Sequence, residues 1–389
     1  MKNNSASRLS PGARIALLSV SWLSAIALTA LTPVLAQISH HFAATPGADA
    51  VIRGLVTSVG MAMIVGAPAA GFLSERFGER AVLLWSLPLF ALSGCLGFVL
   101  ENPWVLLASR VVLGLTVGAG GVAAAALLAN GVPDADRNRW LGYFTLSGMV
   151  GGLLFTPLSG WLGAMNWRFV FPIHLVAFLM LGAVAMRVST GARISPAVPK
   201  QARPQDAFPW GILILGICCG AGVSSIIAYL PFLFREMGFG DPRQVATALT
   251  LGILGSAVTS FLFGWVRRRL DVVPVFAIGF LLVGLGVGLI CGTRAYELHA
   301  LGMFLAGLGN GLVTPNLYAV ATSAPPERRA RRLGMARAGY FGAPLVAQLP
   351  LEPIAATHGP IGVMVAITAF ALLMIGVVFL GRQRLVAPA

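Results

Sequence analysis

The sequence predicts an all-α membrane protein in which twelve transmembrane helices form two pseudo-symmetric six-helix bundles. The first observation is composition, because 57% of the 389 residues are hydrophobic and only 10% are charged. A soluble domain has about 25% charged residues, so lipid must surround most of this chain. The second is the recurrence of apolar stretches of about 20 residues, the length that crosses a bilayer. The third is the alternation of basic residues between the ends of these stretches.

Twelve apolar stretches are long enough to span the membrane. Lipid offers no partner to a backbone N–H or C=O group, so each stretch must be a helix or a strand of a closed barrel. Their length and their lack of strict alternation favour helices. The first stretch is too long an apolar run for a cleaved signal peptide. We expect spans at about residues 14–38, 52–73, 81–100, 104–129, 139–161, 168–187, 210–234, 244–266, 272–292, 296–321, 333–357 and 361–381.

The distribution of lysine and arginine predicts the topology. With the N-terminus in the cytoplasm, five of the 27 Lys and Arg residues fall outside and Arg110 lies within a span, which leaves 21 on the cytoplasmic side. This excess indicates an even number of spans with both termini cytoplasmic, in a cell membrane such as a bacterial inner membrane. The net charge of +14 then reflects topology, and we expect no nucleic-acid partner. The five outer residues are Arg53, Arg168, Arg235, Arg243 and Arg294.

The sequence offers no catalytic constellation. It contains no G-x-S-x-G elbow, no histidine-rich metal set and no pair of acids inside a span, which disfavours an enzyme or a sensor. The four cysteines lie inside apolar spans without metal-ligand spacing, so we interpret them as packing residues. We therefore expect no cofactor and no metal. The cysteines are Cys95, Cys218, Cys219 and Cys291.

The chain divides into two similar halves. Residues 187–210 hold four prolines, four basic residues and no apolar run, which is typical of a linker. We expect an N-terminal bundle at 1–187, a cytoplasmic linker at 188–209 and a C-terminal bundle at 210–389. Parallel six-helix repeats of this kind place a substrate site between the halves. Three pairs of residues share one offset of 193 positions (for example 264 minus 71), namely Gly71 and Gly264, Gly114 and Gly307, and Pro157 and Pro350.

The stretch GFLSERFGER, residues 71–80, lies between the second and third spans. It resembles the signature loop of the major facilitator superfamily, G-x-L-a-D-r-x-G-r-R/K, although Glu75 replaces the usual aspartate and Glu79 a basic residue. A glycine such as Gly71 allows close helix approach, and Gly78 can adopt the positive φ of a tight turn. The resemblance implies that Glu75 pairs with cationic groups at nearby helix ends and latches one access state. The matching residues expected to act in gating are Gly71, Glu75, Arg76, Gly78 and Arg80.

Three further segments are similar to patterns of the same family. LASRVVLGLTVGAG in the fourth span resembles L-x-x-x-R-x-x-x-G, with Arg110 and Gly114 in place. GLLFTPLSGWL at 152–162 resembles the antiporter pattern of the fifth span, which includes Pro157. NWRFVFPIHL at 166–175 looks like the W-R-x-x-F segment of twelve-span drug/proton antiporters. The resemblance covers the whole chain and implies gating roles for Gly114 and Pro157.

Charged groups within the spans are few. A charge in the bilayer centre costs at least about 2.5–3.5 kcal/mol, so Arg110 either snorkels toward the interface or has a function. The family resemblance implies proton coupling for Arg110. All 13 acidic residues fall in loops or near helix ends, so no proton-carrying carboxylate is obvious. The nearest coupling candidate is Glu352, and His174 is a weaker one.

Neutral polar residues occur in the spans expected to face the cavity. Without a mid-membrane acid such a cavity has little to hold a cation, so neutral or weakly anionic compounds suit it better. Each polar residue can instead serve only in helix–helix hydrogen bonding. The candidate substrate-binding residues are Gln37, Ser225, Tyr229, Asn310, Thr314, Tyr318, Tyr340 and Gln348.

The resemblance implies a secondary active transporter that works by alternating access. We expect it to export small, fairly apolar compounds in drug-type efflux coupled to protons. The alternative is a transporter of a sugar, a siderophore or an organic anion, with direction and coupling left open. The expected partners are a small-molecule substrate, protons and the lipid bilayer, and we expect a monomer.

Overall fold

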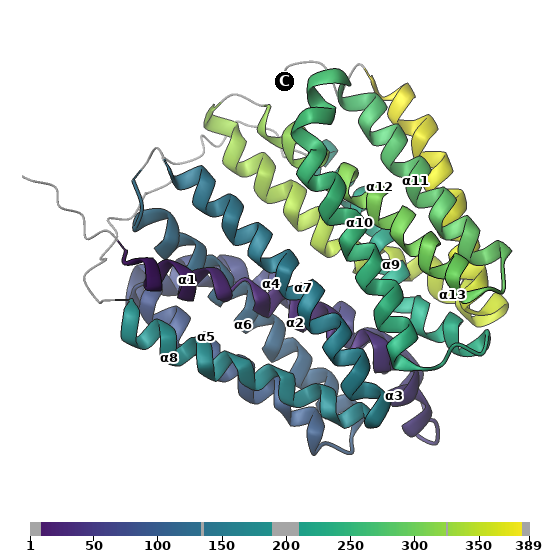
Figure 1. The fold of residues 1–389 in the computed structure, drawn as a ribbon, viewed down its shortest axis with the longest axis horizontal. Coiled ribbons are helices and arrows are strands. Elements are labelled where there is room, and N and C mark those ends of the chain that lie inside the picture. The colour runs from purple at the N-terminus through teal and green to yellow at the C-terminus, as the bar shows by residue number, and fades with distance from the viewer. Residues whose placement is uncertain (1–8, 134–135, 189–209, 324–325, 383–389) are drawn as a thin grey trace, which may run out of the picture. The chain divides into compact units, whose positions relative to one another are not determined.

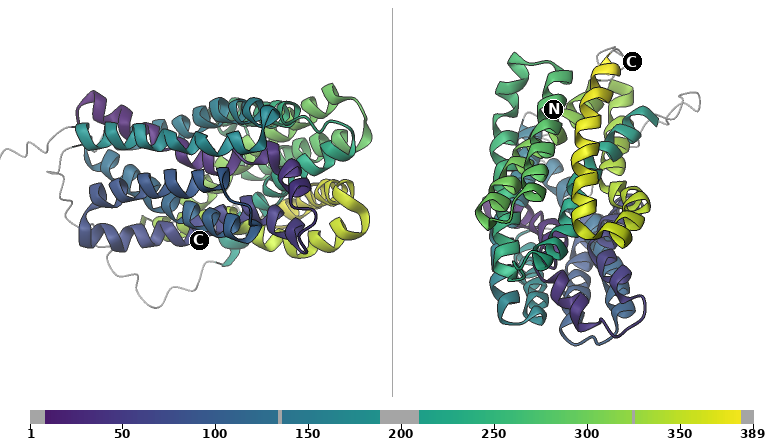
Figure 2. Two further views of the ribbon diagram at one scale, coloured as in Figure 1. Left: turned by 90° about the horizontal axis from the view of Figure 1, so that it is seen from below. Right: turned by 90° about the vertical axis from the view of Figure 1, so that its right-hand side faces the viewer.

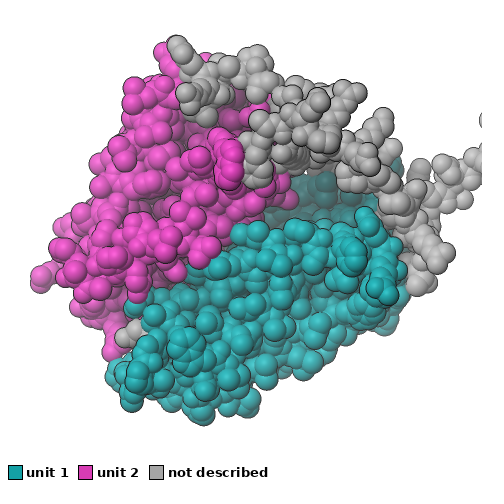
Figure 3. Space-filling view, turned by 180° about the vertical axis from the view of Figure 1, so that it is seen from behind, with its two compact units in different colours: residues 1–31, 37–206 teal, residues 32–36, 207–389 magenta. Residues whose placement is uncertain are grey.

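The computed structural model describes residues 9–133, 136–188, 210–323 and 326–382, and in these ranges every regular element is helical (Figure 1). The chain forms two compact units (Figure 3). Unit 1 comprises Met1–Leu31 and Gln37–Asp206, and unit 2 comprises Thr32–Ala36 and Ala207–Ala389. Within each unit the long helices lie side by side (Figure 2). Of the expected linker 188–209, residues 189–209 lie outside the described part.

Six of the predicted spans have their helices in unit 1, except that Thr32–Ala36 of the first span belong to unit 2. The first begins at α1, where the Ser10 hydroxyl accepts a hydrogen bond from Ala13 N over 3.2 Å, as an N-cap does. It is interrupted near Pro33, because proline lacks the N–H that would continue the helix. The elements are α1 Pro11–Ser19, α2 Trp22–Thr29, η1 Thr32–Val34, α3 Leu35–His41, α4 Ala48–Phe77, α5 Glu79–Cys95, η2 Leu96–Phe98, α6 Pro103–Asn130, α7 Arg137–Met165, η4 Trp167–Leu175 and α8 Val176–Arg187.

The other six predicted spans lie in unit 2. Its last helix, α13, runs over 55 residues but is broken at Gly359, which has φ 65° and ψ −172°. Glycine adopts positive φ without strain, and Pro360 then starts the second segment. The break separates the predicted spans 333–357 and 361–381. The elements are α9 Trp210–Glu236, α10 Pro242–Arg269, α11 Val272–Gly292, α12 Tyr296–Thr322 and α13 Pro326–Leu380.

The helices have the length and apolarity of membrane spans. Within the described residues, ten are long and apolar enough to cross a bilayer, and one of these, Arg332–Leu380, contains the Gly359 break and covers two predicted spans. Helix α12 is 27 residues long but is not among the ten. It carries several polar residues, including Asn310, Thr314 and Asn316, which lower its hydropathy. The predicted fold class, an all-α membrane protein with two six-helix bundles, is thus confirmed.

The two units share a packing feature that the sequence offset anticipates. A side chain at Gly114 of α6 would overlap the Val59 carbonyl oxygen of α4. A side chain at Gly307 of α12 would overlap the backbone of Gly252 in α10. Backbones can approach this closely only where a small residue stands at the contact. The matched glycines therefore occupy equivalent helix crossings, α4 with α6 and α10 with α12.

Candidate functional site

Arg110 lies in the interior of unit 1. It is on α6 and is 1% exposed, one of the largest fully buried side chains. Its Nη2 donates to the carbonyl oxygens of Ser93 and Gly94 over 3.0 and 2.8 Å, and its Nε donates to Ser109 Oγ over 3.4 Å. The two carbonyls belong to the last turn of α5, where backbone acceptors have no helical partner and the helix dipole is negative. The guanidinium therefore caps the C-terminus of α5.

Two side chains of η4 complete the surroundings of Arg110. Its Nη1 lies 3.5 Å from His174 Nε2, and its Cζ lies 5.4 Å from the centre of the Phe171 ring. His174 Nδ1 lies 2.8 Å from the Phe171 carbonyl oxygen. Because a guanidinium only donates and a carbonyl only accepts, this pattern assigns the neutral tautomer with the proton on Nδ1. The ring contact fits a cation–π interaction.

No opposing charge from the described part of the chain lies at the Arg110 site. No carboxylate oxygen of the described residues lies within 4.0 Å of its guanidinium. The glycines of the neighbouring segment make room for the η4 side chains, since a side chain at Gly94 would overlap the His174 ring and one at Gly97 the Phe171 ring. With 1% exposure, Arg110 does not reach an aqueous interface as a snorkelling arginine would. The two coupling candidates of unit 1, Arg110 and His174, are thus in contact.

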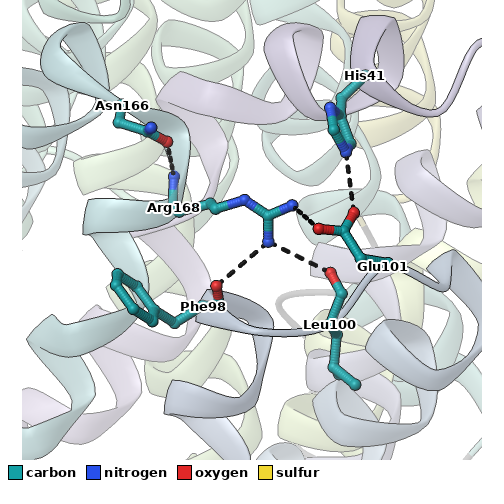
Figure 4. Close-up of polar contacts among 6 residues, drawn as sticks. All are labelled: His41, Phe98, Leu100, Glu101, Asn166 and Arg168. Carbon is teal, nitrogen blue, oxygen red and sulfur yellow. Dashed lines mark hydrogen bonds and ion pairs between the residues drawn. The ribbon is translucent and has the colours of Figure 1, made fainter.

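A second polar cluster joins three connections of unit 1 (Figure 4). Arg168, in the first turn of η4, forms an ion pair with Glu101, its Nη2 lying 2.6 Å from Oε1. Its Nη1 donates to the carbonyl oxygens of Phe98 and Leu100 over 3.2 and 3.5 Å. Glu101 Oε2 lies 3.2 Å from His41 Nε2, at the end of α3. The hydrogen bond with His41, followed by the charge of Arg168, lowers the pKa of the Glu101 carboxyl.

Aromatic rings connect this cluster to Arg110. Arg168 Cζ lies 4.4 Å from the centre of the Trp167 ring, and the Trp167 and Phe171 rings are 5.9 Å apart. His41 also packs on Trp167, with ring centres 5.2 Å apart. Phe171 in turn contacts the Arg110 guanidinium. The W-R-x-x-F segment thus carries both the outer ion pair and the ring next to the buried arginine. Sequence reasoning missed Glu101 and His41, which lie far from Arg168 in the chain.

The residues expected to act in gating differ in their exposure and in their hydrogen bonds. Gly78 joins α4 to α5 with φ 84° and ψ 149°, a conformation that glycine adopts readily. Arg80 donates from Nε to the Val188 carbonyl over 2.6 Å and from Nη2 to the Ala185 carbonyl over 3.0 Å, which caps the end of α8. Glu75 is exposed in unit 1 and forms no ion pair with another described residue. The remaining residues, Gly71 and Arg76, are exposed near the end of α4. A side chain at Gly71 would meet no described atom within 4 Å, so the close helix approach expected at this glycine is not observed.

Pro157 lies within α7, next to side chains that tie this helix to the first span. Thr156 Oγ1 donates to Thr29 Oγ1 over 2.9 Å, and Ser159 Oγ donates to the Ala30 carbonyl. Proline leaves the backbone carbonyl of the preceding turn without its donor, which makes a helix easier to bend. The proline is thus flanked by attachments on both sides. Gln37, on α3, has a buried Oε1 with no hydrogen-bond partner among the described residues.

In unit 2 a coupling candidate and a substrate-binding candidate are in contact. The Tyr229 hydroxyl of α9 donates to Glu352 Oε2 of α13 over 3.0 Å. Tyr229 is buried, and Gln348 lies one turn before Glu352 on α13. Ser225 is one turn before Tyr229, but its hydroxyl donates to the Ala221 carbonyl of its own helix over 2.7 Å. Of these hydrogen bonds, the one between Tyr229 and Glu352 involves a carboxylate.

A second set of candidates forms a hydrogen-bonded group around Asn310. Its Oδ1 accepts from Thr314 Oγ1 over 3.0 Å and from the Tyr340 hydroxyl over 3.2 Å. Its Nδ2 donates to Ser256 Oγ over 3.4 Å. The group therefore links α10, α12 and α13 through neutral side chains. Tyr318, two turns after Asn310 on α12, has the Arg337 Cζ 5.6 Å from its ring centre.

Comparison with known proteins gives a family-model match over nearly the whole chain. The model described as Major Facilitator Superfamily matches residues 17–246 and 212–388. A tetracycline resistance protein of class E from Escherichia coli is 25% identical over 285 residues, which are 70% of each chain. A multidrug export protein of Haemophilus influenzae is 28% identical over 42% of this chain and 32% of its own length. A gallate transporter of Pseudomonas putida is 28% identical over 60% of this chain and 61% of its own length. The chain thus spans less than two thirds of the last two proteins.

Solved structures share the fold at low sequence identity. A POT family transporter in complex with 5-aminolevulinic acid superposes with a TM-score of 0.78 at 14% identity, over 96% of each chain. A D-xylose-proton symporter superposes with a TM-score of 0.75 at 15% identity, over 95% of this chain and 97% of the other. These structures support the twelve-helix architecture alone.

Proposed function

This chain belongs to the Major Facilitator Superfamily and is a transporter of that family, and we propose that it exports small, fairly apolar compounds. The export works by alternating access and is driven by a proton gradient. The proposal rests on the charges of the residues in the candidate sites. Arg110 donates only to neutral acceptors, and the Asn310 group consists of neutral side chains.

The charges of the candidate residues favour neutral over cationic substrates. A cationic substrate needs an anionic partner when it leaves water, because an unpaired charge is expensive in a low-dielectric site. Among the coupling and substrate-binding candidates only Glu352 can supply one, and its carboxylate already accepts from Tyr229. Neutral compounds with a few hydrogen-bonding groups fit the hydroxyl and amide groups of Tyr340, Thr314 and Asn310. Two relatives, one named for tetracycline resistance and one for multidrug export, favour efflux of such compounds.

We place proton binding at Glu352. A carboxyl that exchanges a proton during transport needs a partner that stabilises one of its two states. The Tyr229 hydroxyl, which donates to Glu352 Oε2 over 3.0 Å, is such a partner. Arg110 acts in this scheme as a fixed charge that holds α5, α6 and η4 together while the proton moves elsewhere.

The domain and topology assignments remain part of the proposal. We propose that residues 1–187 and 210–389 act as the two moving bundles, joined by a cytoplasmic linker at 188–209. Both termini face the cytoplasm of a cell whose inner membrane holds the protein as a monomer. The basic loops that support this orientation are a property of the sequence.

Transport in sealed vesicles tests the function and the coupling together. The full chain is reconstituted, a proton gradient is imposed, and movement of the neutral, apolar dye N-phenyl-1-naphthylamine is followed with and without a protonophore. Glu352→Gln should abolish gradient-driven transport and leave downhill exchange intact. Glu297→Gln, at an exposed carboxyl of the same unit, serves as the matched control. Transport at an unchanged rate with the protonophore would refute proton coupling. No movement of the probe would refute the export function.

A second candidate function is transport of an organic anion. The fixed charge of Arg110 favours an anionic substrate, since no carboxylate of the described residues lies within 4.0 Å of it, and one relative is named a gallate transporter. The two functions differ in their response to Arg110→Ala. Loss of transport for anionic compounds alone would favour the anion function, whereas loss of all gradient-driven transport would favour a role in coupling.

A further inference from the structure

Four side chains form a continuous cluster where α1 and α7 begin. The Arg14 guanidinium of α1 lies 5.0 Å from the centre of the Trp140 ring of α7. The Trp140 and Tyr143 rings are 5.5 Å apart and nearly perpendicular, at 87°. Arg139 donates from Nε to the Tyr143 hydroxyl over 2.8 Å. We call Arg14, Arg139, Trp140 and Tyr143 the arginine–aromatic cluster.

Among the described residues, no carboxylate is paired with the positive charge of the cluster. Neither guanidinium forms an ion pair with another described residue. Asp136, at the N-cap of α7, acts on Arg139 through space only, and the two make no ion pair. Arg14 Nε is buried and has no acceptor among the described residues, so this donor of the guanidinium is unsatisfied. A guanidinium donates readily to the oxygens of a phosphate.

An exposed apolar stripe on α7 starts at the cluster. Tyr143 is 37% exposed, and the residues that follow it at intervals of three and four, Leu146, Val150 and Leu154, are 52%, 41% and 54% exposed. These intervals place all four on one helix face. From Tyr143 to Leu154 the helix rises about 16 Å at 1.5 Å per residue, close to the thickness of one lipid leaflet's hydrocarbon. The stripe is thus long enough for an acyl chain.

We propose that the arginine–aromatic cluster binds the phosphate of an anionic phospholipid whose acyl chain lies along the α7 stripe. The guanidinium groups of Arg14 and Arg139 contact the phosphate. The indole and phenol rings hold the glycerol region, since amphipathic rings favour the membrane interface. The alternative is that the cluster only holds α1 against α7 within the bundle. The two accounts differ because a purely structural contact needs no phosphate.

Lipid titration of the full chain tests the proposal. Dioctanoyl phosphatidylglycerol is added to the protein in a neutral detergent, and bound lipid is counted by native mass spectrometry. Dioctanoyl phosphatidylcholine and inorganic phosphate serve as the other probes. The wild-type chain should bind phosphatidylglycerol saturably, and Arg14→Gln with Arg139→Gln should weaken that binding about 30-fold. Replacing Arg267 and Arg268 of α10 with glutamine removes the same charge and should leave the affinity unchanged.

The other outcomes would overturn the proposal. Equal binding of phosphatidylglycerol by the Arg14/Arg139 double variant would mean that the cluster only holds α1 against α7. Equal weakening in the Arg267/Arg268 control would mean unspecific attraction to the basic surface. Competition by inorganic phosphate at the same concentration would mean a free-phosphate site without lipid. If the double variant fails to fold, Trp140→Phe, which keeps both charges and loses the larger ring, should weaken lipid binding while leaving a folded chain.

Discussion

Replacing Arg110 with methionine removes the guanidinium from the interior of unit 1 while keeping a long, flexible side chain. The substitution leaves the carbonyl oxygens of Ser93 and Gly94, now 3.0 and 2.8 Å from Nη2, without their donor. It also removes the ring contact with Phe171 and the partner of His174 Nε2. The end of α5 then has no cap from α6.

The expected loss follows from these contacts. A hydrogen bond to a charged group contributes about 1.5–3 kcal/mol, and each buried acceptor left unpaired costs about 1–3 kcal/mol. Methionine avoids the desolvation of a charge, which offsets part of this loss. We expect a net loss of about 3 kcal/mol. With an unfolding entropy of about 2.1 cal/mol/K per residue over 389 residues, the melting temperature should fall by about 4 °C.

Thermal unfolding of the purified chain in detergent measures this loss. Arg110→Lys is the internal control, because an ammonium keeps the charge but cannot make the same pair of bonds to Ser93 and Gly94, so it should lose less stability. Arg268→Gln, at an exposed position of α10, should melt as the wild-type chain does. A methionine variant that melts at or above the wild-type temperature would refute the reasoning, since the α5 carbonyls would then need no guanidinium.

Three further predictions follow from the described contacts. Glu101 has a lowered pKa in the folded chain through its bond with His41, so its contribution is present above the ordinary pKa of 4.5 and is lost as the pH falls through the lower folded value. Glu101→Gln should therefore flatten the acid side of a melting-temperature profile, and an unchanged profile would contradict the assignment. Gly307→Leu should abolish folded protein in size-exclusion chromatography because a side chain there overlaps the α10 backbone, whereas Gly264→Leu, with no atom within 4 Å, should be tolerated. Gly359→Ala forces a side chain to φ 65° and ψ −172°, a conformation almost restricted to glycine, and should cost about 1–3 kcal/mol in thermal unfolding; equal stability would contradict this assignment.

The sequence predicted the parts of the fold that depend on lipid as solvent. Apolar runs had to be helices, and their number and order agree with the observed elements. The break at Gly359 fell between the two last predicted spans, because a helix cannot continue unchanged through positive φ and a following proline. Helix ends were harder to predict. Helix α4 covers Ala48–Phe77, beyond the expected 52–73, since a helix continues into the interface after its apolar residues end.

The candidate site was less accessible to sequence reasoning. A lone arginine in a span marks a special position, but its acceptors here are backbone carbonyls of Ser93 and Gly94, which have no sequence signature. Glu101 directly follows one expected span and Arg168 begins another, yet nothing in a single sequence pairs residues 67 positions apart. The pairing of Tyr229 with Glu352 likewise depends on the register between α9 and α13. Such contacts emerge only when the helices pack.

Trp167 occupies a position that makes it an intrinsic optical reporter. Its indole has a guanidinium on one side, with Arg168 Cζ at 4.4 Å, and the His41 ring at 5.2 Å. It also touches Phe171, the ring beside Arg110. A change of charge or spacing at any of these neighbours alters the electric field on the indole. The emission of this one tryptophan, isolated by replacing the other seven of the chain's eight, would therefore follow rearrangements of the bundle in real time without an added dye.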